Sequence, residues 1–156
     1  MLYSIKVKIL TSLVKIASKV VSGVFKVEVP PVPSVAAIIE KNGKILAIDL
    51  TYKKGYALPG GVLKGNENFT TAIKREIKEE TGLTVTWLKF YNTFTDTSQF
   101  PKVVVVYLVK VKGNLRKGSN EGSTEWVAPE ILIKNMAYKD NLTAIKSYLR
   151  ENKHVR

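Results

Sequence analysis

Three glutamates on one predicted helical turn constrain this chain more than any other feature. Within the stretch from Gly61 to Leu83, Glu76, Glu79 and Glu80 are spaced i, i+3 and i+4, which gathers three carboxylates on one face of an α-helix. Like charges at this spacing destabilise a helix. A divalent cation would relieve the repulsion, and carboxylate oxygens suit Mg²⁺ or Mn²⁺. We therefore expect a fold that presents this turn as a metal site.

The helix that carries these glutamates has recognisable ends in the sequence. Asn66 or Asn68 can serve as its N-cap, and Gly82 is a typical glycine after the last turn. An apolar stripe adjoins the carboxylates and is formed by Phe69, Ala72, Ile73 and Ile77. The glutamates are therefore expected to face the body of the domain, where their charge needs a counter-ion.

Composition excludes several other kinds of site. The chain has 156 residues, the size of one compact domain, and it contains no cysteine, which excludes disulfides and thiolate metal sites. His154 is the only histidine, so a histidine-based zinc site or a Ser-His-Asp triad is not expected. A metal must therefore be held by oxygen ligands, and the absence of cysteine fits a cytoplasmic protein.

The net charge of +12 points to anionic partners. The lysines are spread along the chain rather than packed into one run, which favours small phosphorylated nucleotides over specific nucleic acid binding. A lysine-rich solvated surface is the alternative explanation of the charge.

Residues 1–29 form a segment of a different character from residues 30–156. Polar residues with a basic bias and apolar residues recur there in two separate helical stripes, which predicts an amphipathic helix. Because Lys15 and Lys19 interrupt the apolar positions, neither a signal peptide nor a membrane-spanning helix is expected. Two alternatives stay open: docking on the same domain or on a second copy in a homodimer, which we favour, and peripheral contact with an anionic membrane. The stripes are Lys8, Ser12, Lys15, Lys19, Ser22 and Lys26, and Ile9, Leu13, Ile16, Val20 and Val24.

The rest of the chain alternates strand and helix patterns, which predicts an α/β fold. Prolines 30, 31 and 33 suggest a rigid linker, and Asn42-Gly43 between two apolar runs predicts a hairpin. Further strands are expected at 83–97, at 102–112 and at 125–127. Pro129 can open one helix, and Asp140 can cap the last one.

The stretch from Gly61 to Leu83 resembles the signature of the nudix hydrolase family, G-x5-E-x7-R-E-U-x-E-E-x-G-U, where U is a bulky aliphatic residue. Every fixed position matches: Gly61, Glu67, Arg75, Glu76, Ile77, Glu79, Glu80, Gly82 and Leu83. The resemblance implies an α/β/α sandwich with a mixed β-sheet. It also implies metal-dependent cleavage of a pyrophosphate bond in a nucleoside diphosphate linked to another moiety, such as a nucleoside triphosphate, a nucleotide sugar or ADP-ribose. A catalytically silent nudix-fold module that binds a nucleotide is the alternative.

By position, the resemblance assigns roles to individual residues. Mg²⁺ (or Mn²⁺) would be held by Glu76, Glu79, Glu80 and the carbonyl of Gly60. Glu67, Arg75, Gly61 and Gly82 would support the loop and the helix. The catalytic base would be Glu76 or Glu79, or a glutamate from a later loop, with Glu121 the first candidate and Glu125 the second.

A basic and aromatic loop just before the signature is the expected substrate contact. Lys53 and Lys54 can meet phosphates there, and Tyr56 can stack on a base. A solvated loop is the equal alternative. The markers downstream of the signature do not select a substrate.

Overall fold

The computed structural model describes residues 30–98 and 100–153, together with Ser12, Leu13, Ile16, Ala17, Val20 and Gly23 of the first segment. The strands are β1 (Val32–Ile38), β2 (Glu40–Lys41), β3 (Lys44–Leu50), β4 (Tyr56–Ala57), β5 (Gly60–Val62), β6 (Thr84–Asp96), β7 (Lys102–Lys112) and β8 (Gly122–Val127). The helices that follow within residues 30–153 are α2 (Phe69–Thr81), α3 (Pro129–Asn135) and α4 (Lys139–Lys153).

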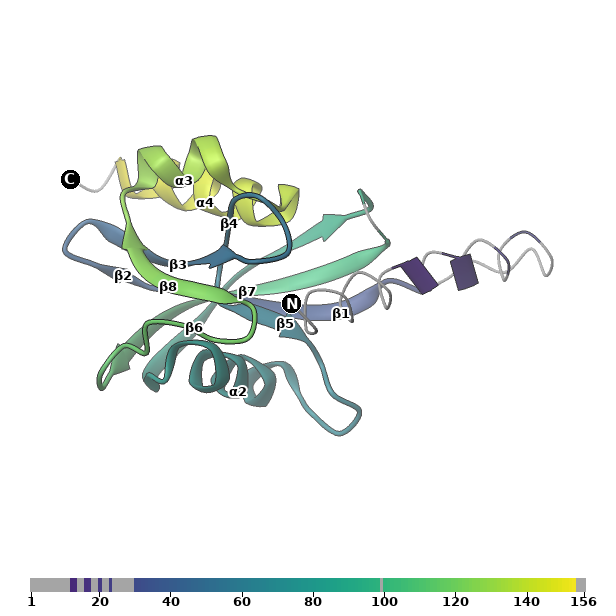
Figure 1. The fold of residues 1–156 in the computed structure, drawn as a ribbon, viewed down its shortest axis with the longest axis horizontal. Coiled ribbons are helices and arrows are strands. Elements are labelled where there is room, and N and C mark those ends of the chain that lie inside the picture. The colour runs from purple at the N-terminus through teal and green to yellow at the C-terminus, as the bar shows by residue number, and fades with distance from the viewer. Residues whose placement is uncertain are drawn as a thin grey trace.

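The strands form two sheets between two helical layers. One sheet has the order β5-β1-β7-β6 and is mixed, because β1 runs parallel to β7 while the other pairs are antiparallel. The other is built around β3, which pairs with β2, β4 and β8, all antiparallel. Helix α2 covers one side, and α3 and α4 cover the other (Figure 1). The expected α/β/α sandwich with mixed strands is confirmed, with the strands divided between two sheets.

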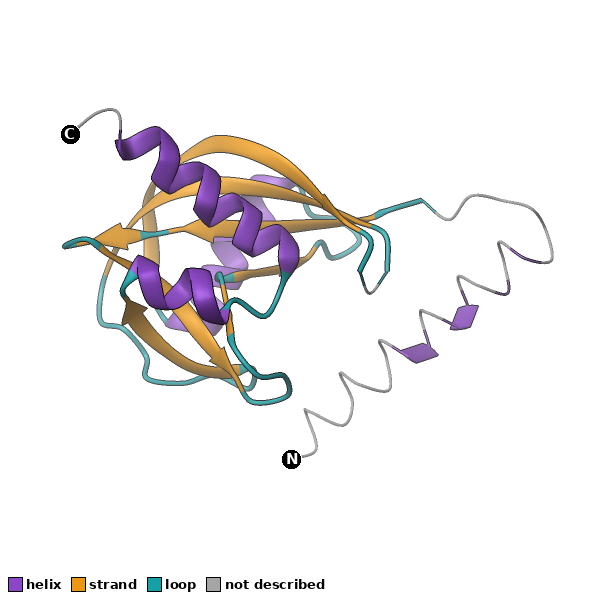
Figure 2. Ribbon diagram, turned by 90° about the horizontal axis from the view of Figure 1, so that it is seen from above, coloured by secondary structure: helices purple, strands orange, loops and turns teal. Residues whose placement is uncertain are grey.

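Alternate residues of β1 feed the two halves of the core. Val35 and Ala37 pack in the cluster that contains Ile73 and Ile77 of α2. Ala36 and Ile38 pack on the opposite side, in the cluster that contains Leu132 of α3 and Ile145 of α4. Seen from above, α3 and α4 lie side by side over the strands (Figure 2). The central strand therefore joins the α2 layer to the α3–α4 layer.

The predicted hairpin is present but short. Asn42 and Gly43 have φ angles of 52° and 73°, which suit a tight turn between β2 and β3. Only Glu40 with Ile45 and Lys41 with Lys44 pair across it. The apolar run before the turn instead pairs with β5 and β7. Asn42 and Gly43 therefore determine the turn itself, whereas the apolar run pairs with distant strands, where it becomes buried.

Two local expectations are wrong. Pro33 lies inside β1 rather than in a linker, near the start of the strand, where a proline is tolerated. Asp140 lies within the first turn of α4 and is buried, and its carboxylate is 3.1 Å from the Lys102 ammonium group. Its ion pair with β7 replaces the predicted N-cap role.

The amphipathic helix predicted in residues 1–29 lies for the most part outside the described residues. The six residues that are described there have helical backbone. Among the described helices, none is both long enough and apolar enough to cross a membrane.

Candidate active site

Helix α2 begins and ends close to where the sequence predicts. The Asn68 side chain accepts a hydrogen bond of 2.8 Å from the Thr71 N–H, which caps the first turn. Gly82 follows the last turn with φ 75°, and its N–H donates to the Lys78 carbonyl over 3.1 Å. Ala72, Ile73 and Ile77 are fully buried. This anchoring turns part of the carboxylate face toward the sheets.

Glu80 is the most deeply buried of the three glutamates, with only 4% of its surface exposed. Its Oε2 accepts the Gly60 N–H over 2.9 Å, while its Oε1 is buried with no hydrogen-bond partner among the described residues. Burial, together with the nearby charges of Glu121 and Glu76, raises the pKa of Glu80 well above its usual value. A buried carboxylate with an unsatisfied oxygen is a group that a cation would stabilise.

Glu76 lies against the backbone of the glycine loop. Burial raises its pKa, the Arg75 guanidinium opposes this, and the charges of Glu79 and Glu121 add to it. A Cβ atom on Gly61 would lie 2.5 Å from Glu76 Oε1. Gly61 therefore leaves the space in which the Glu76 carboxylate sits.

Gly61→Ala is expected to displace the Glu76 carboxylate while leaving the fold intact, because the clash is with the end of a side chain rather than with backbone. We expect turnover to fall about tenfold or more, since small misplacements at a reacting centre are costly. The unfolding free energy should change by less than about 1 kcal/mol. Gly65→Ala is the control, because nothing lies within 4 Å of a Cβ there. Equal activity in the two variants would contradict this role of Gly61.

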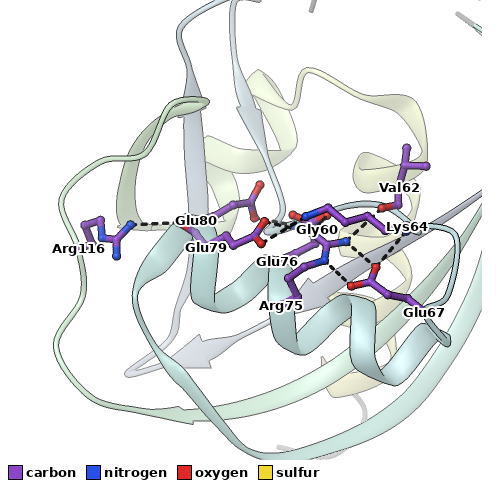
Figure 3. A network of polar contacts seen from close by, with 9 residues as sticks. All are labelled: Gly60, Val62, Lys64, Glu67, Arg75, Glu76, Glu79, Glu80 and Arg116. Atoms are coloured by element: carbon purple, nitrogen blue, oxygen red, sulfur yellow. Dashed lines mark hydrogen bonds and ion pairs between the residues drawn. The ribbon is translucent and has the colours of Figure 1, made fainter. Parts of the chain in front are cut away.

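Arg75 contacts three carboxylates at once (Figure 3). Its Nε and Nη2 donate to the two oxygens of Glu67 over 2.5 and 2.8 Å, a bidentate pair. Its Nη1 lies 2.6 Å from Glu76 Oε1 and 3.1 Å from Glu79 Oε2. The Lys64 N–H also donates to Glu67 over 3.0 Å. Arg75 thus ties the loop before α2 to the carboxylates on the helix.

Because of the Arg75–Glu67 ion pair, we expect the stability of the folded protein to fall in acid. Hydrogen bonds from Arg75 lower the pKa of Glu67 from 4.5 to about 2. A carboxylate with a lowered folded pKa contributes stability that is complete above pH 4.5 and is lost as the pH falls from there through about 2. Urea unfolding across this window should show a steeper loss of stability in the parent protein than in Glu67→Gln. Parallel pH profiles for the two proteins would contradict the assignment.

Glu79 does not face the body of the domain as expected. Its side chain is 52% exposed and pairs with the Lys64 ammonium group over 3.4 Å as well as with Arg75. Within the described residues, no group of three acidic or histidine side chains is assembled closely enough to hold one ion. Glu79 lies at the edge of α2, where solvent compensates its charge, so a cation would have to compete with Lys64 for it.

The two later glutamates have different surroundings. The charge of Glu121 contributes to the raised pKa values of both Glu76 and Glu80, so Glu121 lies beside the α2 carboxylates. Its carbonyl accepts both the N–H and the hydroxyl of Thr51, over 2.9 and 3.1 Å. Glu125 instead accepts a hydrogen bond of 3.1 Å from the Tyr56 hydroxyl. The structure therefore brings Glu121, the first candidate, next to the carboxylates.

The basic loop before the signature contacts the segment that leads into α4. The Lys53 ammonium group lies 4.2 Å from the centre of the Tyr138 ring, and the hydroxyls of Tyr52 and Tyr138 are 3.1 Å apart. Lys54 is exposed, and Tyr56 is bound to Glu125. Of the predicted substrate contacts, Lys53 thus adjoins Tyr138, a residue that sequence reasoning missed because no local pattern distinguishes it.

A buried ion cluster beside Tyr138 was also missed. The Lys102 ammonium group lies 3.7 Å from Asp96 and 3.1 Å from Asp140, and 4.9 Å from the centre of the Tyr138 ring. Asp96 and Asp140 lie far apart in the sequence, so no local signal could join them. A separate groove of about 850 Å³ lies between the β2–β3 hairpin and helices α3 and α4, and none of the candidate metal-binding or catalytic glutamates lines it.

The chemistry of these donors fits a hard divalent cation, although no three of them are close enough together in the described residues to hold one ion. Glu76 and Glu80 are largely buried carboxylates, Glu121 lies beside them, and Glu79 stands at the rim. These side chains offer only oxygen, which Mg²⁺ and Mn²⁺ prefer. The unsatisfied oxygen of Glu80 is the strongest local reason to expect a cation.

Comparison with known proteins finds a matching family, curated relatives and solved structures of similar fold. A family model described as the NUDIX domain matches residues 30–148. An ADP-ribose pyrophosphatase of Methanocaldococcus jannaschii is 32% identical over 133 residues, which cover 81% of this chain and 78% of the relative. An 8-oxo-dGTP diphosphatase of Buchnera aphidicola is 35% identical over 86 residues, covering 52% of this chain and 65% of the relative. The MutT protein of Methanosarcina mazei has a similar fold, with a TM-score of 0.65 at 22% identity over 81% of this chain and 99% of that one.

Proposed function

Since this chain belongs to the NUDIX family, we propose that it is a metal-dependent enzyme that cleaves a pyrophosphate bond in a nucleoside diphosphate linked to another moiety. The candidate substrates are nucleoside triphosphates, nucleotide sugars and ADP-ribose. The observation that carries the proposal is the buried Glu80 carboxylate, which has one unsatisfied oxygen and lies beside Glu76 and Glu121. Such a group is costly unless a cation binds it.

The proposed roles rest on the match of each residue to the family signature, and the surroundings of Arg75 and Gly82 support theirs. Glu76, Glu79 and Glu80, with the Gly60 carbonyl, would hold Mg²⁺ or Mn²⁺. The ion would neutralise phosphate charge and lower the pKa of water. Arg75 keeps Glu76 and Glu79 in fixed orientations through its bond to Glu67. Gly82 ends α2 so that the helix does not run past the glutamates.

Glu121 is proposed as the base that takes the proton from the attacking water. Its backbone is held by Thr51, while its carboxylate lies near those of Glu76 and Glu80, the proposed metal ligands. Glu121→Gln is expected to lower kcat about a hundredfold with a smaller effect on KM, the scale of losing a general base. Glu125→Gln, the same chemical change at a residue bound to Tyr56, should stay within about twofold. A larger loss of kcat in Glu125→Gln than in Glu121→Gln would instead identify Glu125 as the base.

A substrate panel tests the proposed function directly. Nucleoside triphosphates, ADP-ribose and nucleotide sugars are incubated with Mg²⁺ or Mn²⁺, and the released monophosphate or pyrophosphate is identified by chromatography. The relatives named for ADP-ribose and 8-oxo-dGTP make these two classes the first to test. We expect metal-dependent release from at least one class. Ligand-induced thermal stabilisation without any product would instead identify a catalytically silent nucleotide-binding module.

A further inference from the structure

Trp87 is an exposed tryptophan on the outermost strand of its sheet. It belongs to β6, which stands at the end of the order β5-β1-β7-β6 and pairs with β7 alone among the described strands. The residue is 46% exposed, although tryptophan is highly buried on average. The Lys110 ammonium group lies 5.7 Å from the centre of its ring, a cation–π contact. A large flat ring is therefore accessible beside a positive charge.

A β-bulge gives Trp87 this orientation. Val85 pairs with Val111, and both pack against the core cluster beside α2. In a regular strand, the side chain two residues after Val85 would point to the same side. The register shift after Val85 instead places Trp87 opposite Lys110. The Thr86 hydroxyl holds the bulge by donating to the Lys110 carbonyl over 3.1 Å. The bulge therefore turns the ring away from α2.

Three lysines share the face of the sheet that Trp87 occupies. Lys112 lies two residues after Lys110 on β7, so the two side chains point the same way. Lys89 lies two residues after Trp87 on β6 and pairs with Leu108, which packs in the cluster on the side away from α2. All three lysines are exposed, and none of them makes an ion pair with a carboxylate of the described residues.

The charge of these paired strands is of one sign. Residues 84–95 and 103–112 contain the three lysines and no aspartate or glutamate. Helix α4 covers the same face further along β6, where Glu151 accepts a hydrogen bond of 2.9 Å from the Tyr91 hydroxyl. The surface formed by Trp87, Lys89, Lys110 and Lys112, here called the Trp87 patch, is therefore basic and aromatic.

We propose that the Trp87 patch binds single-stranded nucleic acid. A base stacks on the ring of Trp87, and the three lysines contact the neighbouring phosphates. Such binding tolerates any sequence, because every base has a flat face. An acidic peptide would use the lysines but leave the ring without a stacking partner. A second copy of this chain is a poorer occupant, since it would bring the same lysines to the interface.

This inference does not rest on the proposed hydrolase function. The Trp87 patch lies on the face of the sheet opposite α2, whereas the candidate metal-binding glutamates lie on α2. The two proposals can fail separately, because binding of an oligonucleotide needs no turnover and turnover of a free nucleotide needs no patch.

Titration of the full chain with single-stranded oligouridylate tests the proposal. The chain has two tryptophans, and the other one, Trp126, packs against the core beside α2. We expect part of the intrinsic fluorescence to be quenched as a base stacks on Trp87. In Trp87→Ser the quenching should disappear, and the affinity for labelled RNA, measured by anisotropy, should fall about tenfold, the scale of one stacked base. Trp87→Phe keeps a flat ring and should stay within about threefold of the parent.

A second pair of substitutions tests the phosphate contacts. Lys89→Gln with Lys110→Gln should weaken binding and reduce the slope of log affinity against log salt by about 1.4, since each contact with a single-strand phosphate contributes about 0.7. Lys74→Gln with Lys134→Gln makes the same charge change at exposed positions of α2 and α3 and should leave the slope unchanged. Every variant should remain folded by circular dichroism and turn over a free nucleotide at the parent rate.

Several results would overturn the proposal. They are no binding to oligouridylate, unchanged binding in Trp87→Ser, and an equal loss in the control with both Lys74 and Lys134 replaced. An RNA duplex that binds as tightly as the single strand would also overturn it, because paired bases cannot stack on the ring, and the binding would then be adhesion of a basic protein to any polyanion. Binding of polyglutamate that needs Lys89 and Lys110 but not Trp87, without binding of RNA, would identify an acidic peptide as the partner instead.

Discussion

Glu80→Gln is expected to lower metal-dependent kcat/KM by about 10²–10³-fold, the scale of losing one charged contact at a reacting centre. Glutamine keeps the size of the side chain and one oxygen to accept the Gly60 N–H. It removes the negative charge that a cation would meet at the buried Oε1 position. The same variant should bind Mn²⁺ more weakly in a titration without substrate.

The same substitution should stabilise the metal-free protein. A buried carboxylate without a full set of partners opposes folding, and the glutamine amide can donate a hydrogen bond where the carboxylate oxygen has none. We expect a gain of about 1–2 kcal/mol in unfolding free energy at neutral pH. Activity and stability therefore change in opposite directions, which a merely structural role for Glu80 would not produce. Glu130→Gln, on the exposed start of α3, is the control and should change neither quantity.

The stability that Glu80→Gln gains over the parent protein should increase as the pH rises. The pKa of Glu80 is raised in the folded state, so the folded protein holds a proton that the unfolded chain releases above pH 4.5. The stability of the metal-free protein should consequently fall as the pH rises from 4.5 toward the raised folded value. Glu80→Gln should flatten this fall, and so should saturating Mg²⁺ in the parent protein. A metal-free Glu80→Gln variant that is less stable than the parent would contradict the assignment.

The sequence predicts the helix and its caps well because these depend on neighbours in the chain. Asn68 and Gly82 lie next to the turns they cap, and the apolar stripe has helical spacing. It does not predict which strands pair, because pairing depends on distant partners. The parallel pairing of Val35 with Val105 is one example, and neither residue carries a signal for the other. Because β1 pairs with β7, it lies in a different sheet from β3, which follows it closely in the sequence.

The same distinction applies to the candidate site. The i, i+3, i+4 spacing of the glutamates brings them to one region of α2, but it does not show that Glu80 is buried while Glu79 is half exposed. This difference comes from the sheet surface beside the helix. Glu121 reaches the site through a loop held by Thr51, which only the folded chain brings near. The basic loop likewise meets Tyr138 through tertiary packing alone.

Arg75→Met is expected to destabilise the protein and reduce its activity together. The substitution leaves Glu67 and Glu76, which are largely buried, without their common partner. We expect a loss of about 2–3 kcal/mol in unfolding free energy, below the roughly 3–5 kcal/mol of a fully buried pair because Arg75 is partly exposed. Turnover should fall about a hundredfold, because Glu76 and Glu79 lose a fixed orientation. Chemical denaturation and steady-state kinetics measure the two effects.

A compensating variant separates the two roles of Arg75. In Arg75→Met with Glu67→Met, no charge is left unpaired in the loop, so much of the lost stability should return. Activity should not return, because nothing then orients the carboxylates of Glu76 and Glu79. Arg116→Met is the matched control: Arg116 donates only to the Glu79 carbonyl, over 3.3 Å, among its side-chain hydrogen bonds in the described structure. It should cost less than about 1 kcal/mol. Recovery of activity along with stability in the double variant would show that Arg75 only holds the loop in place and does not position the metal-binding carboxylates.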